Sequence, residues 1–202
     1  MSRVIAYGYD YPAGNMVERW SVWGVCGKSW TVIDIRDGAH VRQFLERTFS
    51  AFRRLKAKRR LPAFIDALIS AKTVNQPVEI SLVAVYISLE MLKDSWARFK
   101  GIPFHGGHFW HVDSNTGKRM NRYGFEAMLR DMLAEVGMKP KLKLLVRYRN
   151  ALIHSGGLRL SHRTKGRAYE TVQRLAREYA LRLLGYKGPY VVFGSLRLGH
   201  LK

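Results

Sequence analysis

Hydrophobic positions recur with helical periodicity over most of the chain. Apolar residues return every three or four positions, which favours helices over strands. The predicted helices are 41–55, 62–69, 78–99, 125–136, 142–155 and 169–183. Residues 78–99 are apolar on almost every side, so we expect that helix to be the buried centre of a mainly α-helical fold.

The two ends of the chain have a different pattern. The N-terminal segment is rich in Tyr, Trp and Val, and "WSVWGV" and "WTVIDI" predict two short strands in it, with the tail "YVVFGSLRL" as a further strand beside them. Residues 101–119 contain Gly, His and Asn and are expected to form a loop. The chain is thus divided into an aromatic β-containing segment (1–37), a helical connector (38–75), a helical bundle (76–186) and a basic tail (187–202).

The helix that ends at His154 has an unusual core-facing side. Within "LKLLVRYRNALIHSGG" (142–157), the apolar residues Leu142, Leu145, Val146, Leu152 and Ile153 share one side. Arg149 lies in the middle of that side. A guanidinium among apolar residues requires a buried partner or a bound anion. Glu90, within the long apolar helix, is the expected partner. A phosphate is the alternative, and both can apply.

Polar side chains suited to phosphate chemistry lie on another side of the same helix. Asn150 and His154 are one helical turn apart, and Arg147 lies seven residues before His154 on the same side. Imidazole titrates near neutral pH and can accept or donate a proton. The helix end therefore predicts a site with Arg147, Asn150 and His154 in a row and Arg149 beside them.

The charge of the chain indicates a polyanionic partner. There are 35 Lys and Arg residues against 15 Asp and Glu, a formal net charge of +20, and such an excess destabilises a compact fold through self-repulsion. The imbalance is greatest after residue 139. We expect RNA, such as tRNA or another abundant RNA, as the partner. The predicted phosphate contacts that follow the helix are Arg159, Arg163, Lys165 and Arg167.

Other features of the sequence bear on its cellular setting. Cys26 is the single cysteine, which excludes an internal disulfide and a Cys-based zinc site and fits a reducing cytosol. The longest uncharged apolar run, Ile80–Leu89, is half the length of a membrane span. No secretion signal follows Met1. We therefore expect a cytoplasmic protein with no membrane partner.

The motif "RNALIH" (Arg149–His154) resembles the signature of the HEPN superfamily, in which an arginine and a histidine are separated by a few residues and Asn commonly follows the arginine. The segment "YISLEML" (86–92) resembles the long first helix of the Apea-like HEPN branch. The similarity covers about residues 76–186. It implies a HEPN-like helical bundle, here with a small N-terminal β-containing segment.

The resemblance also implies a function and partners. HEPN proteins dimerise so that two Arg/His motifs face each other, and many are metal-independent endoribonucleases in toxin–antitoxin, CRISPR and antiphage systems. Carried over to this chain, the catalytic residues are Arg149, Asn150 and His154, with Arg147 as a second candidate for the phosphate and with no cofactor. A homodimer and an antitoxin or defence-complex partner are expected. Gly156 stands where some toxin members carry a tyrosine that an antitoxin modifies, so that route of control is not expected here.

The sequence leaves three other interpretations open. The chain could be an RNA-binding HEPN module without catalysis, or an interaction subunit of a larger complex. The third concerns "HGGHFWH", where His105, His108 and His111, with Asp113 nearby, have spacing that could hold a metal ion. A more ordinary use of that segment is RNA contact, with Phe109 and Trp110 stacking on bases.

Binding of RNA should be strongly salt-dependent. If about six basic residues contact phosphates, raising salt from about 50 to 200 mM should weaken binding about a thousandfold. His154→Ala should keep the slope, whereas neutralising Arg163, Lys165 and Arg167 together should flatten it. Fluorescence anisotropy with a labelled RNA at several salt concentrations measures the slope. A slope near zero for the parent protein would mean that its charge serves another partner.

Overall fold

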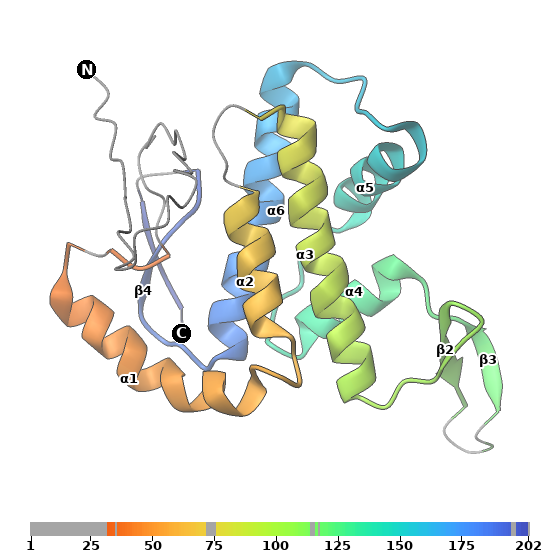
Figure 1. Cartoon of the computed structure of the whole chain (residues 1–202), viewed down its shortest axis with the longest axis horizontal. Coiled ribbons are helices and arrows are strands. Elements are labelled where there is room, and N and C mark those ends of the chain that lie inside the picture. The colour runs from red at the N-terminus through yellow and green to blue at the C-terminus, as the bar shows by residue number, and fades with distance from the viewer. Residues whose placement is uncertain are drawn as a thin grey trace, which may run out of the picture.

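The computed structural model is a helical bundle with small antiparallel sheets at its margins (Figure 1). It describes residues 32–34, 36–71, 76–113, 116, 118–194 and 197–201. In this part of the chain the helices are α1 (Gly38–Leu55), α2 (Leu61–Ser70), α3 (Val78–Phe99), α4 (Phe125–Ala134), α5 (Lys143–Ser155) and α6 (His162–Leu183). The prediction of a mainly α-helical fold is confirmed, although α6 begins earlier than its apolar spacing indicated. The strand predicted from "WSVWGV" lies outside the described residues. Of "WTVIDI", only residues 32–34 are described, and they do not form a strand.

Helix α3 is the centre of the bundle, as its apolar sequence predicts. Leu82, Leu89 and Leu92 on this helix are fully buried, and α2, α4, α5 and α6 all pack against it. Burial of this shared apolar surface holds the four helices in place around α3. None of the described helices, α3 included, is both long and apolar enough to cross a membrane.

A second, smaller core joins the two ends of the described chain. Its buried members are Ile33, Leu181, Tyr186 and Leu201. Phe44 of α1 packs edge-on against Tyr186, with ring centroids 5.3 Å apart, so this cluster attaches α1 to the end of α6. Helix α2 belongs instead to the main core, to which it contributes Leu61, Phe64 and Leu68.

The C-terminal tail forms two strands, which pair with each other. β4 (Pro189–Val191) and β5 (Leu198–His200) are antiparallel neighbours. The tail also meets the first described residues, since the backbone N–H of Val191 donates to the carbonyl of Val32 at 2.8 Å. The predicted pairing of this tail with N-terminal strands lies otherwise outside the described residues.

The expectation of a loop at 101–119 is wrong, because a three-stranded antiparallel sheet occupies this region. It consists of β1 (Phe104–His105), β2 (His108–Val112) and β3 (Arg119–Arg122). The β1–β2 turn is Gly106–Gly107, with φ of 58° and 77°. Two consecutive residues at positive φ match the twist of a hairpin, and glycine adopts this conformation without strain. The glycine pair was therefore a hairpin signal. Figure 1 shows the sheet projecting from one end of the bundle.

Capping fixes the connection between α5 and α6. Helix α5 ends at Gly156, whose φ of 67° is left-handed and suits glycine. Helix α6 begins after Ser161, whose side chain accepts a hydrogen bond from the backbone N–H of Thr164 at 3.3 Å. His154 therefore lies in the last turn of a helix with a defined end.

Truncation of the α3 core should strongly destabilise the bundle. Leu89→Ala leaves a cavity at a fully buried position, so we expect unfolding free energy to fall by about 2–5 kcal/mol. Leu144→Ala is the matched control, because Leu144 is 50% exposed and its loss should cost no more than about 0.5 kcal/mol. Urea unfolding followed by circular dichroism measures both. Equal midpoints for the two variants would contradict the central position of α3.

Candidate active site

The side of α5 that packs against the core differs from the predicted one by a rotation about the helix axis. Leu145 and Leu152 are buried, but Ile153 is 53% exposed. Tyr148, which the apolar pattern left out, packs partly buried against the core, and it moves the centre of the buried side away from Arg149. Arg149 therefore lies at the edge of this side, with 21% of its side chain exposed, and not at its middle.

Glu90 of α3 is the ion-pair partner of Arg149, which confirms the prediction from the sequence. Arg149 Nη2 donates to Glu90 Oε1 at 2.6 Å. The other carboxylate oxygen, Oε2, lies 2.7 Å from Lys93 Nζ. Sequence reasoning missed Lys93, although its position three residues after Glu90 on a helix is typical of a neighbouring ion pair. One carboxylate thus holds two cations from two helices.

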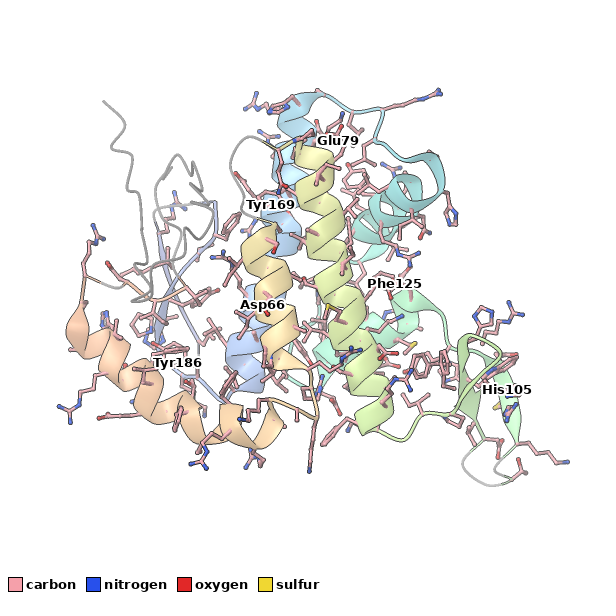
Figure 2. The ribbon with its side chains drawn as sticks, viewed as in Figure 1. Asp66, Glu79, His105, Phe125, Tyr169 and Tyr186 are labelled. Atoms are coloured by element: carbon pink, nitrogen blue, oxygen red, sulfur yellow. The ribbon has the colours of Figure 1, made fainter. Side chains whose placement is uncertain are left out.

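Phe125, the first residue of α4 and labelled in Figure 2, supports both cations with its ring. The ring centroid lies 4.9 Å from Arg149 Cζ and 5.4 Å from Lys93 Nζ. An aromatic face attracts cations, and the attraction grows when they are partly withdrawn from water. Glu90, Lys93, Phe125 and Arg149, here called the Arg149 cluster, thereby join α3, α4 and α5. The cluster carries two positive charges and one negative charge.

The remaining donors of Arg149 show how the guanidinium is oriented. Arg149 Nη1 donates to Asn150 Oδ1 at 3.1 Å, at an exposed position. Arg149 Nε is buried and has no hydrogen-bond partner among the described residues, a cost that the strong contact with Glu90 offsets. Glu90 therefore holds the inner edge of the guanidinium, while Nη1 lies at the surface next to Asn150.

The predicted row on α5 is exposed to solvent. Arg147, Asn150 and His154 are all exposed, and their spacing places them on one side of the helix. Within the part of the chain that the structure describes, the side chain of His154 has no hydrogen bond or ion pair, so its imidazole is accessible to a ligand. Arg147 lies over the ring of Tyr148, with Cζ 5.7 Å from the centroid. The hydrogen bond between Arg149 and Asn150 connects this row to the Arg149 cluster.

The basic residues that follow α5 do not form one uniform set. Arg159 and Arg163 are exposed and close to the α5–α6 connection in sequence. Lys165 pairs with Glu79 of α3, and this hydrogen bond lowers the pKa of Glu79. Glu79 is labelled in Figure 2. Arg167 is exposed on α6, where it lines a cleft between α5 and α6. Lys165 is thus committed to a structural ion pair, and the other three have free charges among the described residues.

Phe109 and Trp110, predicted to stack on RNA bases, both lie in the projecting sheet β1–β2–β3. Phe109 is 6% exposed and packs against Phe104, with ring centroids 4.8 Å apart. Its ring offers no free face to a base. Trp110 remains partly exposed, and its indole N–H donates to the carbonyl of His105 at 3.0 Å. Of the two predicted stacking residues, the structure leaves only Trp110 accessible.

The histidines of that sheet do not converge. His105 and His108 face each other across the β1–β2 turn, whereas His111 stacks on Tyr123 with centroids 3.7 Å apart. No group of three His, Cys, Asp or Glu side chains that could hold a metal ion occurs among the described residues. The metal interpretation of "HGGHFWH" therefore has no geometric basis in the described part of the chain.

Comparison of the chain with protein-family models, with curated proteins and with solved structures found no match. The features of the chain that bear on function are therefore the geometry of the Arg149 cluster and the exposed row on α5.

Loss of Arg149 should destabilise the fold, whereas loss of His154 should not. Arg149→Ala removes a contact that joins α5 to α3 and α4 but leaves Glu90 paired with Lys93, so we expect a cost of about 1–3 kcal/mol. Glu90→Gln should cost at least as much, because it leaves two neighbouring cations without a carboxylate. His154→Ala changes an exposed side chain and should stay within about 0.5 kcal/mol of the parent. Chemical unfolding of the three variants gives these values. Parent-like stability of Arg149→Ala would show that the contacts of Arg149 do not stabilise the fold.

Proposed function

We propose that this protein is a metal-independent endoribonuclease of the HEPN type. The observation that carries the proposal is the placement of His154, which is exposed and whose side chain has no partner among the described residues, one turn from Asn150. The Asn150 side chain in turn accepts a hydrogen bond from the Glu90-bound Arg149. A proton-transfer group and a fixed guanidinium on one helix end suit attack on a phosphodiester. The net charge of +20 supports RNA as the substrate.

The reaction proposed is transesterification by the RNA itself. The 2′-oxygen forms a bond to the adjacent phosphorus, and the bond from phosphorus to the 5′-oxygen breaks. The 2′-hydroxyl loses a proton and the leaving 5′-oxygen gains one, so the products are a 2′,3′-cyclic phosphate and a 5′-hydroxyl. His154 accepts the first proton or donates the second, because a neutral imidazole is a base and an imidazolium is an acid.

In this mechanism Arg149 and Arg147 stabilise the transition state. Negative charge develops on the phosphorane oxygens, and a preorganised guanidinium lowers its energy without rearrangement at the moment of reaction. Arg149 is preorganised by Glu90 and Phe125. Arg147 is exposed on the same helix and is the second candidate for phosphate contact. Asn150 links the two groups and can orient either the phosphate or His154.

We further propose that the active form is a homodimer built around the end of α5. One histidine fills one proton-transfer role at a time, so His154 from each of two copies would supply both the base and the acid. The exposure of Ile153, directly beside His154, supports a protein contact at this helix end. Sedimentation at micromolar concentration should show a dimer. A monomer with and without RNA would contradict this part of the proposal.

The biological setting proposed is antiphage defence or a toxin–antitoxin system in the cytoplasm, with tRNA or another abundant RNA as target. This setting follows from the resemblance of "RNALIH" to the HEPN signature. A non-catalytic RNA-binding module or an interaction subunit is the second candidate, and it is favoured by the same positive charge.

Cleavage in the absence of divalent metal separates these candidates. The purified protein should cleave total RNA in EDTA, and His154→Ala should reduce the rate about a hundredfold or more while RNA affinity is retained. An oligonucleotide with deoxyribose at the cleaved position should bind but remain intact, since it lacks the 2′-hydroxyl. Gel analysis of end-labelled RNA measures all three.

The contradicting outcomes are specific. Cleavage that requires added metal, or cleavage at the parent rate by His154→Ala, would exclude the proposed mechanism. Tight RNA binding with no cleavage by the parent protein would favour the binding module.

A further inference from the structure

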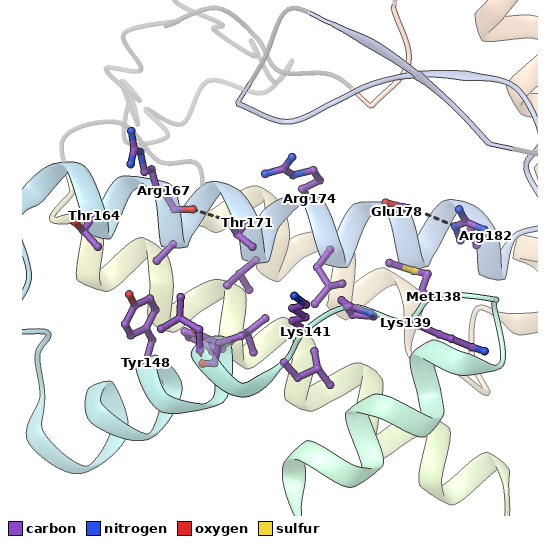
Figure 3. Close-up of a pocket in the computed structure, with 18 of the residues that line it drawn as sticks. Met138, Lys139, Lys141, Tyr148, Thr164, Arg167, Thr171, Arg174, Glu178 and Arg182 are labelled. Atoms are coloured by element: carbon purple, nitrogen blue, oxygen red, sulfur yellow. Dashed lines mark hydrogen bonds and ion pairs between the residues drawn. The ribbon is translucent and has the colours of Figure 1, made fainter.

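A cleft of about 570 Å³ separates α5 from α6. Figure 3 shows it lying between α6 on one side and the start of α5 with its preceding loop on the other. Both helices pack mainly on α3 and hardly on each other, so a gap remains between them above α3. A gap between two helices that share a third is the shape that accepts an additional helix in a helix-in-groove complex.

The floor of the cleft is mainly aliphatic. It includes Leu145 of α5 with Val172 and Leu175 of α6. Tyr86 of α3 also lines it, but its hydroxyl is occupied, since it donates to the carbonyl of Leu145 at 2.9 Å. Burial raises the pKa of Tyr86, which keeps that hydroxyl protonated. Nucleic-acid strands are bound on exposed aromatic platforms that stack on bases. Tyr86 is 2% exposed and Tyr148 is partly buried against the core, so this floor favours apolar side chains of a protein instead.

The rim of the cleft is basic. Lys139, Lys141, Arg167 and Arg174 line it, and none of them has an ion pair with a carboxylate among the described residues. Glu178 is the acidic residue in the lining, and it is already paired with Arg182 at 2.9 Å. Unpaired like charges along one groove repel one another, and an acidic ligand relieves this repulsion.

The cleft is long and faces away from the candidate active site. Its lining on α6 runs from Thr164 to Arg182, a distance of about 27 Å along the helix. Leu144, Leu145 and Tyr148 are the α5 residues in the lining. Their mean direction lies about 130° around α5 from the row of Arg147, Asn150 and His154. A ligand in the cleft would therefore not be the strand acted on by His154.

We propose that this cleft binds an acidic amphipathic helix of a partner protein. Leucine-like side chains on one face of the helix would occupy the aliphatic floor, and Glu or Asp on its flanks would meet the basic rim. The site is independent of the proposed ribonuclease reaction, because it uses another side of α5. Leu144, which is 50% exposed, also lines the cleft and would be covered in the complex.

A synthetic peptide tests the proposal directly. The probe is a fluorescent helical peptide of about 18 residues, matched to the length of the cleft, with Leu every third or fourth position and Glu on both flanks. Its controls are the same peptide with Lys in place of Glu and a sequence-scrambled form. The acidic amphipathic peptide should bind the full-length protein, and both controls should bind at least about tenfold more weakly. His154→Ala should bind the peptide as the parent does.

Two charge-matched variants locate the binding. Lys141→Glu combined with Arg174→Glu reverses two rim charges and should weaken peptide binding about tenfold or more. Lys58→Glu combined with Lys118→Glu makes the same change in net charge at exposed positions outside the lining, and it should change affinity less than about twofold. All four positions are exposed, and thermal unfolding confirms that both variants fold.

Three results would overturn the proposal. The first is equal binding of the acidic and the lysine peptides. The second is an equal loss of affinity in the two variants, which would mean attraction by net charge alone. The third is a parallel loss of single-stranded RNA affinity in Lys141→Glu/Arg174→Glu, with RNA displacing the peptide. That result would make the cleft an RNA path.

Discussion

The carboxylate of Glu90 is the constraint on which the candidate site depends. It accepts contacts from Arg149 and Lys93 through separate oxygens, and both cations lie over Phe125. Without it, two partly buried positive charges would be neighbours with no compensating anion, which is costly. With it, α3, α4 and α5 are joined at one point. The same contact orients the guanidinium that reaches Asn150 and hence the exposed row.

Three sides of helix α5 have different surroundings. Leu145 and Leu152 anchor it to the core, the Leu144–Tyr148 side borders the cleft, and Asn150 with His154 is open to solvent. A partner helix in the cleft would therefore touch the helix that carries the proposed catalytic residues without covering them. This arrangement would let a partner influence the site through the position of α5 while the side that carries Asn150 and His154 stays open to solvent.

Much of this organisation could be predicted from the sequence, because it depends on local periodicity. The spacing of apolar residues predicts all six described helices, and Glu90 was recognisable as the acid in the apolar α3 that could meet Arg149. Features that depend on tertiary packing could not be predicted. Tyr148 packs against the core and shifts the centre of the buried side of α5 away from Arg149. Phe125, which contacts Arg149, belongs to a separate helix. Phe104 packs against Phe109, so that ring has no free face. The cleft exists only because α5 and α6 both pack on α3, which no local pattern encodes.

The chemical nature of the ends produced from RNA tests the central claim most directly. Mass spectrometry of the fragments from a defined oligoribonucleotide, incubated with the protein in EDTA, identifies both ends at the cleaved linkage. Attack by the 2′-hydroxyl with His154 transferring the proton predicts a 2′,3′-cyclic phosphate, or the monophosphate formed from it by hydrolysis, and a 5′-hydroxyl. A 5′-phosphate with a 3′-hydroxyl would require water as the nucleophile and would contradict the mechanism derived from α5.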